Sequence, residues 1–283
     1  MVQLIECPRD AMQGLPDFIP TDVKAAYINQ LLRVGFHSID FGSFVSAKAI
    51  PQMRDTVEVL SKLDLSNTET KLLAIVANER GAAEAVEYKE ITYLGYPFSV
   101  SETFQLRNTN ATISESVLRV EAIQELCIKR NKQLVLYISM GFGNPYGDDW
   151  NAEVVMDWVG KMAALDIKIF SLSDTVGVSN PESISYLFSN LIPAYPHLEI
   201  GAHLHTQPHN WREKVHAAYT NGCTRFDAAM KGFGGCPMAK DDLTGNMATE
   251  NLVSYFSETN VPLGIDFQQF IRSLSQANDV FPH

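Results

Sequence analysis

Two histidines separated by a single residue, His203 and His205, form the first pattern in the sequence that could do chemistry. They end an apolar run that predicts a β-strand, and alternate residues of a strand point to the same side. Both imidazoles can therefore bind one ion, and Asp10, after the first predicted strand, adds a carboxylate. Imidazole and oxygen ligands without a thiolate favour Mg²⁺ or Mn²⁺ over Zn²⁺. The alternative is that the histidines are structural.

Three further polar residues have a functional and a structural interpretation. Arg9 can donate two hydrogen bonds to an enolate or carboxylate oxygen, or it forms a surface ion pair with Asp10. Cys236 follows three glycines that permit left-handed turns, which predicts either a lid carrying a thiol or a tight turn. Asn246 precedes a predicted helix and is either a metal ligand or a cap residue. The residues alone leave these alternatives open.

These side chains must be positioned by an alternation of strands and helices that runs along the whole chain. The predicted strands are Val2 to Glu6, His37 to Phe41, Lys71 to Ala77, Glu90 to Phe98, Gln133 to Met140, Lys168 to Ser173, Leu198 to His205 and Arg225 to Met230. The predicted helices are Thr21 to Arg33, Ile50 to Leu63, Glu79 to Glu87, Ile113 to Lys129, Ala152 to Leu165, Glu182 to Tyr195, Trp211 to Asn221 and Thr249 to Thr259.

Eight consecutive strand–helix units without a break in composition predict an α/β fold in which residues 1–283 form a single (β/α)₈ TIM barrel. Leu263 to Asp279 would be an extra C-terminal helix. The alternative is a doubly wound open sheet, but the sequence lacks the GxGxxG and GxxxxGK[ST] phosphate loops that such sheets use. In a barrel the active site lies at the carboxyl ends of the strands. Asp10, Asp40, Ser43, Ser171, Asp174, His203 and His205 all belong to such ends.

Composition excludes several classes of protein. With 46% apolar residues the chain is an ordinary globular one, and its formal charge of −11 disfavours nucleic acid and anionic membranes as partners. An anionic substrate would need local compensation, from a cation or from clustered arginine and lysine. The cysteines, at positions 7, 127, 223 and 236, form no CxxC pair. Without a leader or membrane span we expect a cytoplasmic protein.

Several strings of residues together resemble the 3-hydroxy-3-methylglutaryl-CoA lyase family, in order and spacing, over nearly the whole chain. They are PRDAMQG at 8–14, SFVSAKAIPQM at 43–53, SLSDTVGV at 171–178, HLH at 203–205, GFGGCPMA at 232–239 and TGNMATENLV at 244–253. This family belongs to a larger group of metal-dependent TIM barrels that also contains the isopropylmalate, homocitrate and citramalate synthases.

The resemblance assigns roles to individual residues. It implies that a divalent cation is held by Asp10, His203, His205 and Asn246. Arg9 would stabilise an enolate oxygen, and Cys236 would be the catalytic thiol on a mobile loop. Asp40 would pair with the arginine and take part in proton transfer, and the expected substrate contacts are Ser43, Ser171 and Asp174. Arg107, in the polar segment after the fourth strand, would contact the nucleotide phosphates, or it is a solvated surface residue.

The reaction implied is the metal-dependent cleavage of 3-hydroxy-3-methylglutaryl-CoA, or a related 3-hydroxyacyl-CoA, to acetyl-CoA and a 3-oxo acid such as acetoacetate, with His203 among the catalytic residues. A homodimer is also implied. One alternative is an acetyl-CoA condensing enzyme of the isopropylmalate or citramalate synthase type, whose further C-terminal domains we do not expect after His283. Another is a catalytically silent binder of CoA esters.

This sequence departs from the family pattern at positions that bear on the substrate. Asp40 stands where the family has glutamate, Cys7 where it has glycine, and Thr206 where it has aspartate. The segment Lys240 to Leu243 replaces a small, glycine-containing stretch. We therefore expect the reaction type to be retained and the acyl group to be the variable part.

Overall fold

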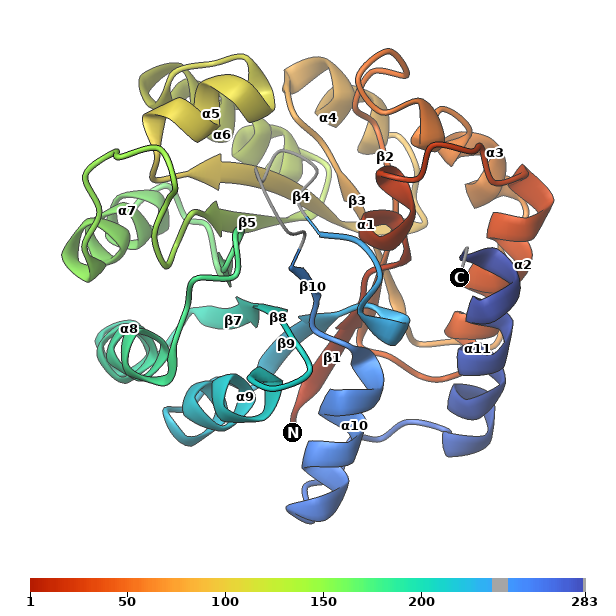
Figure 1. Ribbon diagram of the computed structural model, residues 1–283. Helices are drawn as coiled ribbons and strands as arrows, with labels where there is room; N and C mark the ends of the chain where they lie inside the picture. The colour runs from red at the N-terminus through yellow and green to blue at the C-terminus, as the bar shows by residue number, and fades with distance from the viewer. Residues whose placement is uncertain (236–243, 282–283) are drawn as a thin grey trace.

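Eight parallel strands close into a barrel in the computed structural model, which describes residues 1–235 and 244–281 (Figure 1). In order around the barrel they are β1 (Gln3–Glu6), β2 (Ser38–Ser43), β3 (Lys71–Ile75), β4 (Ile91–Ser99), β5 (Gln133–Ser139), β6 (Ile169–Ser173), β7 (Glu199–His203) and β9 (Arg225–Ala228). β9 pairs with β1, so no barrel edge is left open. The predicted TIM barrel is confirmed, and the open-sheet alternative is wrong.

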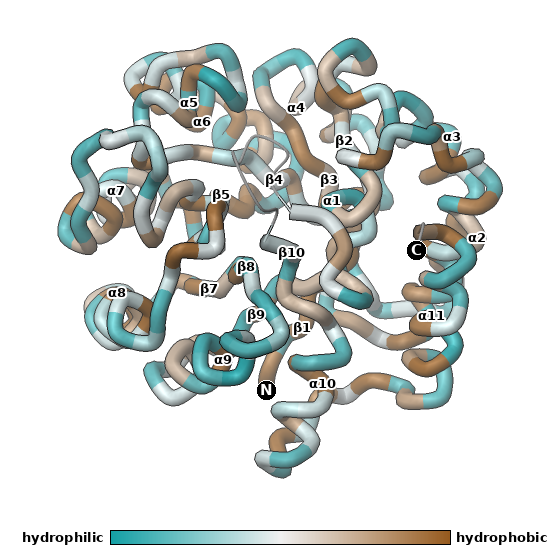
Figure 2. Tube along the Cα trace, in the orientation of Figure 1, coloured by the Kyte–Doolittle hydropathy of each residue, from teal (hydrophilic) through white to brown (hydrophobic). Residues whose placement is uncertain are grey.

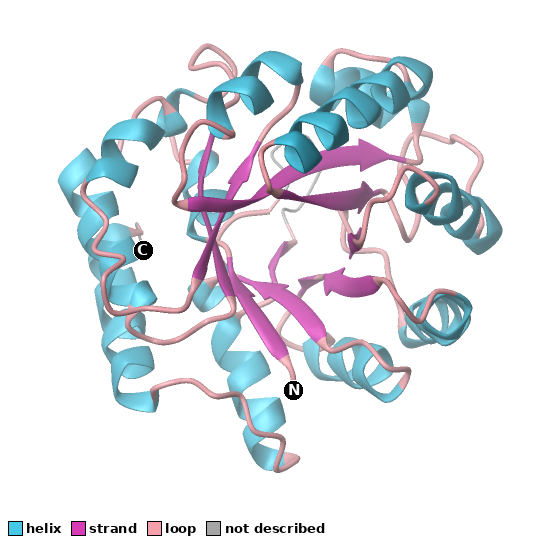
Figure 3. Cartoon of the chain, turned by 180° about the vertical axis from the view of Figure 1, so that it is seen from behind, coloured by secondary structure: helices cyan, strands magenta, loops and turns pink. Residues whose placement is uncertain are grey.

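Helices form the outer ring of the barrel (Figure 3). They are α1 (Pro8–Gln13), α2 (Thr21–Leu32), α3 (Thr56–Ser61), α4 (Glu79–Ala85), α5 (Glu102–Thr109), α6 (Ile113–Lys129), α7 (Ala152–Ala163), α8 (Pro181–Ala194), α9 (Trp211–Thr220), α10 (Thr249–Glu258) and α11 (Phe267–Val280), with the 3₁₀ turns η1 (Pro51–Met53) and η2 (Met230–Gly232). The predicted C-terminal helix is α11, and Gln269 on it accepts a hydrogen bond from Gln30 of α2.

The core lies between the strands and the inner faces of the helices. Figure 2 shows hydrophobic residues along the strands and hydrophobic stretches alternating with hydrophilic ones along outer helices such as α8. Capping boxes at Thr112 and Asn180 fix where α6 and α8 begin. Within residues 1–235 and 244–281, no helix combines the length and the apolar composition that a membrane span requires.

The predicted helix Ile50 to Leu63 is divided into η1 and α3. The hydroxyl of Thr56 donates to the carbonyl of Met53 (2.8 Å) and accepts from the backbone N–H of Ser43 in β2 (3.0 Å). A side chain at Gly42 would lie 2.6 Å from Thr56 Cγ2, so the two segments approach closely only because residue 42 is glycine. This contact with the barrel interrupts the helix.

The predicted strand Leu198 to His205 is also divided, and this division matters for the site. β7 ends at His203, Leu204 turns into the core, and β8 (His205–Thr206) leaves the barrel to pair antiparallel with β10 (Gly245–Asn246). In that pair Asn246 lies opposite His205. The polar segment after β4, where no helix was predicted, forms α5, whose first turn is capped by the hydroxyl of Ser101.

Candidate active site

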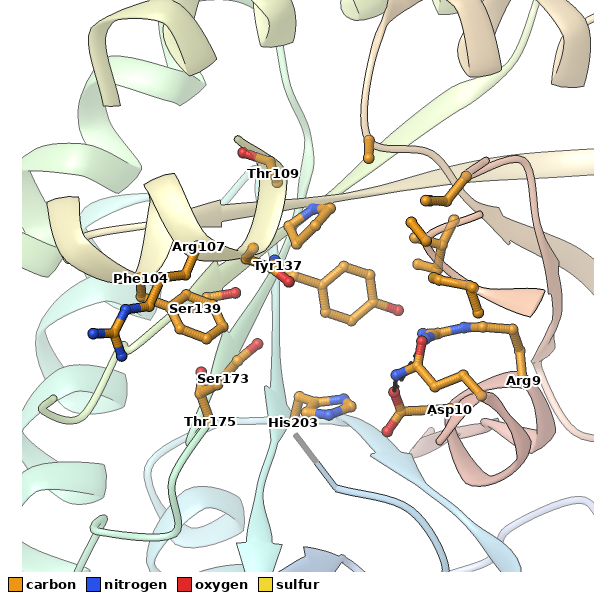
Figure 4. A pocket seen from close by; sticks show the side chains of 18 of the residues that line it. Arg9, Asp10, Phe104, Arg107, Thr109, Tyr137, Ser139, Ser173, Thr175 and His203 are labelled. Atoms are coloured by element: carbon orange, nitrogen blue, oxygen red, sulfur yellow. Dashed lines mark hydrogen bonds and ion pairs between the residues drawn. The ribbon is translucent and has the colours of Figure 1, made fainter. Parts of the chain in front are cut away.

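A cavity of about 370 Å³ opens at the carboxyl ends of the strands (Figure 4). Five of the residues predicted from sequence line it, namely Arg9, Asp10, Arg107, His203 and His205. α1, which directly follows β1, brings Arg9 and Asp10 to the rim, and the end of β7 brings His203. Polar side chains that are about 200 residues apart in the sequence, such as Asp10 and His203, therefore line the same cavity.

Asp10, His203 and His205 form a cluster that can hold a metal ion, because one ligand atom of each lies within 4.8 Å of the others. The side-chain amide of Asn246 donates to Asp10 Oδ2 (2.7 Å), so it lies at the same point. Two imidazoles, one carboxylate and a neighbouring amide are a donor set that suits a divalent cation of the Mg²⁺, Mn²⁺ or Zn²⁺ kind.

The charge states of Asp10 and His205 also favour a cation. Burial alone would raise the pKa of Asp10, but the charges of Arg9 and His203 and the bond from Asn246 outweigh it and leave this pKa below its ordinary value. Burial, together with His203, lowers the pKa of His205 to about 4, which keeps that ring neutral. An ionised carboxylate and a neutral imidazole are the forms that bind metal.

Asp227, on β9, is a functional residue that the sequence reasoning missed. Its Oδ2 lies 3.1 Å from Nδ1 of His203 and accepts the hydroxyl of Ser171 (2.9 Å). Burial would lower the pKa of His203, but the hydrogen bond and charge of Asp227 raise it. The sequence shows a carboxylate inside a predicted barrel strand, but this does not indicate that it faces His203.

Arg9 is held by acidic and polar neighbours on three sides. Its Nε and Nη2 donate to Asp40 (2.6–3.2 Å), and its Nη1 donates to Asp10 (3.1 Å) and Gln13 (2.8 Å). Burial raises the pKa of Asp40 to about 6, although the charge of Arg9 opposes the rise. The predicted pairing of Asp40 with Arg9 is thus present.

Three predicted substrate contacts lie beside the described cavity lining and not in it. The Ser43 hydroxyl accepts from the backbone of Val45 (3.1 Å), and Ser171 is engaged with Asp227. Asp174 accepts from the backbone of Ser179 (3.0 Å) and from Lys214 Nζ (2.8 Å). Direct contacts of Ser43, Ser171 and Asp174 with a substrate therefore stay predictions.

Lys214 connects Asp174 to the candidate metal ligand His205. Besides Asp174 it donates to the backbone carbonyl of His205 (2.9 Å), and its side chain is 1% exposed. The buried ion pair of Lys214 and Asp174 thus lies next to β8 and fixes the backbone of His205, a candidate metal ligand. Lys214 was not predicted as a site residue, because a lysine on an outer helix is usually a surface residue and nothing in the sequence marks this one as buried.

Arg107 and Cys236 complete the predicted set. Arg107 lines the cavity from α5 (Figure 4). Its guanidinium carbon lies 4.6 Å from the ring centroid of Tyr146. Cys236 and the segment 240–243 lie outside the described residues. Gly234 and Gly235, which precede Cys236, have φ values of 91° and 124°, the left-handed turns that the glycines were expected to permit.

Comparisons with known proteins point to one family. A family model described as HMGL-like matches residues 2–277. Hydroxymethylglutaryl-CoA lyase YngG of Bacillus subtilis is 32% identical over 264 residues, which are 93% of this chain and 87% of the relative. The cytoplasmic 3-hydroxy-3-methylglutaryl-CoA lyase of Rattus norvegicus is 30% identical over 275 residues, 96% of this chain and 79% of the relative.

Solved structures give the same picture. An HMG-CoA lyase from Acinetobacter baumannii, solved in complex with coenzyme A and 3-methylmalate, is 32% identical and has a TM-score of 0.91, covering 99% of this chain and 91% of its own. The HMG-CoA lyase of Bacillus subtilis has a TM-score of 0.91 at 30% identity, covering 98% and 93%. The carboxyl transferase domain of Rhizobium etli pyruvate carboxylase, at 17% identity and a TM-score of 0.74, shares the fold.

Proposed function

The chain belongs to the HMGL-like family, and from this premise we propose that it is a metal-dependent carbon–carbon lyase. Its substrate would be 3-hydroxy-3-methylglutaryl-CoA or a closely related 3-hydroxyacyl-CoA, and its products acetyl-CoA and a 3-oxo acid, acetoacetate for the parent substrate. The observation that carries the proposal is the cluster of Asp10, His203 and His205 beside Arg9 at one side of the cavity. The coenzyme A bound in the Acinetobacter relative supports an acyl-CoA substrate.

The residues that would hold the cation are Asp10, His203 and His205, with Asn246 as a further ligand. Mg²⁺ or Mn²⁺ is the proposed ion, with Zn²⁺ the less favoured one. Bound there, a divalent cation would lower the pKa of the substrate's 3-hydroxyl and polarise the adjacent oxygens. Such a cation would also supply local positive charge for an anionic substrate in a protein of charge −11.

In the proposed reaction a base removes the proton of the 3-hydroxyl, and the bond between C2 and C3 breaks. The C–O bond at C3 becomes the carbonyl of the 3-oxo acid, and the electron pair of the broken bond passes to the thioester as an enolate. Arg9 stabilises the negative charge on the enolate oxygen. Asp40, with a pKa of about 6, is suited to exchange a proton near neutral pH. His203, which lines the cavity, would lie next to the reacting oxygens.

The enolate must then take a proton at C2. The resemblance assigns this step to Cys236, and the glycine-flanked loop that it implies would keep water away from the site until the step is complete. Arg107 is proposed to contact the nucleotide phosphates of coenzyme A from α5, and Ser43, Ser171 and Asp174 remain proposed substrate contacts. We also propose that residues 1–283 act as one catalytic domain in a cytoplasmic homodimer.

The test is release of acetoacetate and acetyl-CoA from 3-hydroxy-3-methylglutaryl-CoA by purified protein with Mg²⁺ or Mn²⁺. We expect EDTA and His205→Ala to abolish the release, and His209→Ala, which changes an exposed histidine close by, to leave it unchanged. Cys236→Ser should lower turnover and leave metal content unchanged.

A folded, metal-binding protein that releases no 3-oxo acid from this substrate or from related 3-hydroxyacyl-CoA esters would contradict the lyase. In that case one further assay distinguishes the two alternatives, a condensing enzyme and a catalytically silent binder of CoA esters. Consumption of acetyl-CoA with a 2-oxo acid would indicate the condensing enzyme, and binding of the ester without turnover would indicate the silent binder.

A further inference from the structure

Tyr137 is a cavity residue to which the family resemblance gives no role. It lies on β5, two residues before Ser139, so the two side chains point to the same side of the strand, and both line the cavity. Its ring is 7% exposed and meets the ring of His203 edge to face, with centroids 5.7 Å apart. Figure 4 shows the ring between His203 and Arg9, with the hydroxyl pointing toward Arg9. The phenol is therefore on the floor of the site and directed at its reactive side.

The neighbouring strand makes room for this ring. A side chain at Gly95 on β4 would place its Cβ 2.9 Å from Tyr137 Cε2 and 2.5 Å from Cδ1 of Ile75. These distances are shorter than carbon–carbon contacts allow, so the ring keeps its position because residue 95 is glycine. Tyr137 is thus held by rigid strands and not by a loop, as groups that must meet a substrate accurately usually are.

The hydroxyl of Tyr137 has no hydrogen-bond partner in the described part of the chain. Buried hydroxyls normally find one, since an unpaired polar group away from water costs free energy. Arg9, Asp10 and His203, at the same end of the barrel, all have hydrogen-bond or ion-pair partners. A buried donor without a described partner, on a residue that lines a cavity, is a candidate hydrogen-bond donor to a ligand that packs against it.

Arg9 by itself has little hydrogen-bonding capacity left for a substrate. A guanidinium has five N–H groups. Four of them are used. The N–H on Nε and one on Nη2 donate to Asp40, and the two on Nη1 donate to Asp10 and Gln13. One N–H on Nη2 remains. An oxygen that gains negative charge in a reaction is usually stabilised by more than one donor, so a second donor is needed near Arg9.

We propose that Tyr137 is a further catalytic residue, whose hydroxyl donates a hydrogen bond to the thioester oxygen of the acyl-CoA beside the remaining N–H of Arg9. This inference rests on the proposed lyase function. As the C2–C3 bond breaks and its electron pair moves to the thioester, the oxygen becomes that of an enolate and the bond from Tyr137 strengthens. The phenol keeps its proton throughout, and the proton that C2 gains comes from another group.

The experiment compares Tyr137→Phe with Tyr96→Phe. Both changes remove one buried hydroxyl without a described partner, but Tyr96 lies on β4, is 0% exposed and does not line the cavity. Three quantities are measured, namely Mn²⁺ affinity by calorimetry, exchange of the acetyl-CoA methyl protons in D₂O by NMR, and kcat and KM for cleavage. Proton exchange forms the same enolate without any C–C bond breaking.

For Tyr137→Phe we expect unchanged Mn²⁺ affinity and a fall of about 10- to 100-fold in both the exchange rate and kcat, since loss of one oxyanion donor has effects of about this size or more. KM should change less than kcat, because the bond is strongest to the charged oxygen. Tyr96→Phe should stay within about twofold of the unchanged protein in all three measurements.

The outcomes separate this inference from the proposed function. If the unchanged protein cleaves and exchanges and Tyr137→Phe does so equally well, the role of Tyr137 is refuted and the lyase stands. If Tyr137→Phe loses Mn²⁺ affinity together with activity, its hydroxyl supports the metal site and the assignment to the thioester oxygen is wrong. If the unchanged protein neither cleaves nor exchanges, the proposed function fails and this inference fails with it.

Discussion

His203 and Asp227 face each other across β7 and β9, where they are register partners, and Nδ1 of His203 lies 3.1 Å from Oδ2 of Asp227. The carboxylate accepts the proton on Nδ1 and thereby leaves Nε2 as the nitrogen available to an ion. Ser171, bonded to the same carboxylate oxygen, fixes its orientation in turn. The candidate metal site therefore has a second layer of residues that positions its ligands.

Replacing Asp227 by Asn should weaken Mn²⁺ binding by about 10- to 100-fold, because an imidazole whose orienting carboxylate is removed is a poorer ligand. Calorimetric titration of the purified variant measures this directly. Asp157→Asn is the matched control, since that carboxylate is 61% exposed in a surface pair with Lys161. Equal Mn²⁺ affinity of Asp227→Asn and Asp157→Asn would show that Asp227 does not tune the site.

Replacing Lys214 by Met should lower the free energy of unfolding by about 3–5 kcal/mol, because it leaves the buried carboxylate of Asp174 without its cation. Urea denaturation measures the change. The double variant with Asp174→Asn should recover part of the loss, as expected for two directly coupled groups. Lys161→Met, in a surface pair, should cost less than about 1 kcal/mol. A loss as small for Lys214→Met would mean that the buried pair contributes nothing.

Glu6 should make stability depend on pH. It is 1% exposed and accepts from the backbone of Met230 (2.9 Å) and the hydroxyl of Thr249 (2.6 Å). Burial raises its pKa from 4.5 to about 8. The folded protein thus binds this proton more tightly than the unfolded chain, so the stabilisation is complete below about pH 4.5 and is lost as pH rises toward 8.

Glu6→Gln should therefore remove a decline in stability on the order of 4 kcal/mol between these pH values. Urea denaturation of both proteins between about pH 5 and 8.5, a window set by the shifted pKa, measures the two slopes. Glu58→Gln, an exposed change, should keep the original slope. Parallel pH profiles for Glu6→Gln and the unchanged protein would refute the assignment.

Asp40 should be needed for activity through its hold on Arg9. Asp40→Asn removes the charge that orients the guanidinium, and misplacement of such a group by about 1 Å can cost on the order of 10²-fold in kcat. Asp40→Glu keeps the charge and adds one methylene, so it should retain more activity than Asp40→Asn. Steady-state kinetics on 3-hydroxy-3-methylglutaryl-CoA decide between them. A kcat for Asp40→Asn equal to that of the unchanged protein would refute this role.

The fold could be predicted from the sequence because parallel barrel strands are buried on both faces and therefore appear as continuous apolar runs. The predicted ends of all eight strands lie within two residues of the observed ends. The short helices α1 and α5 were not predicted. Each begins directly after a strand and is too short to show a helical repeat, so contacts with the barrel determine its conformation.

The candidate site could be predicted only in part. The spacing of His203 and His205 indicated an ion site, but it also suggested one continuous strand, whereas Leu204 turns the chain and β8 pairs with β10. Asp227, Lys214 and Tyr137 could not be found in the same way. Their meaning depends on which strands become neighbours when the barrel closes, and no local pattern records that pairing.

The bond between Asp10 and Asn246 joins residues 236 positions apart along the chain. During synthesis the first of these leaves the ribosome long before the second, so a nascent chain cannot assemble the complete cluster until almost all of the barrel has been made. If an ion binds at this cluster, as proposed, its uptake would be a late event in biosynthesis, and the ion could not serve as a template for early folding. Once bound, the ion would link the segment after β1 to the segment after β9. Separation of β1 from β9 would release it.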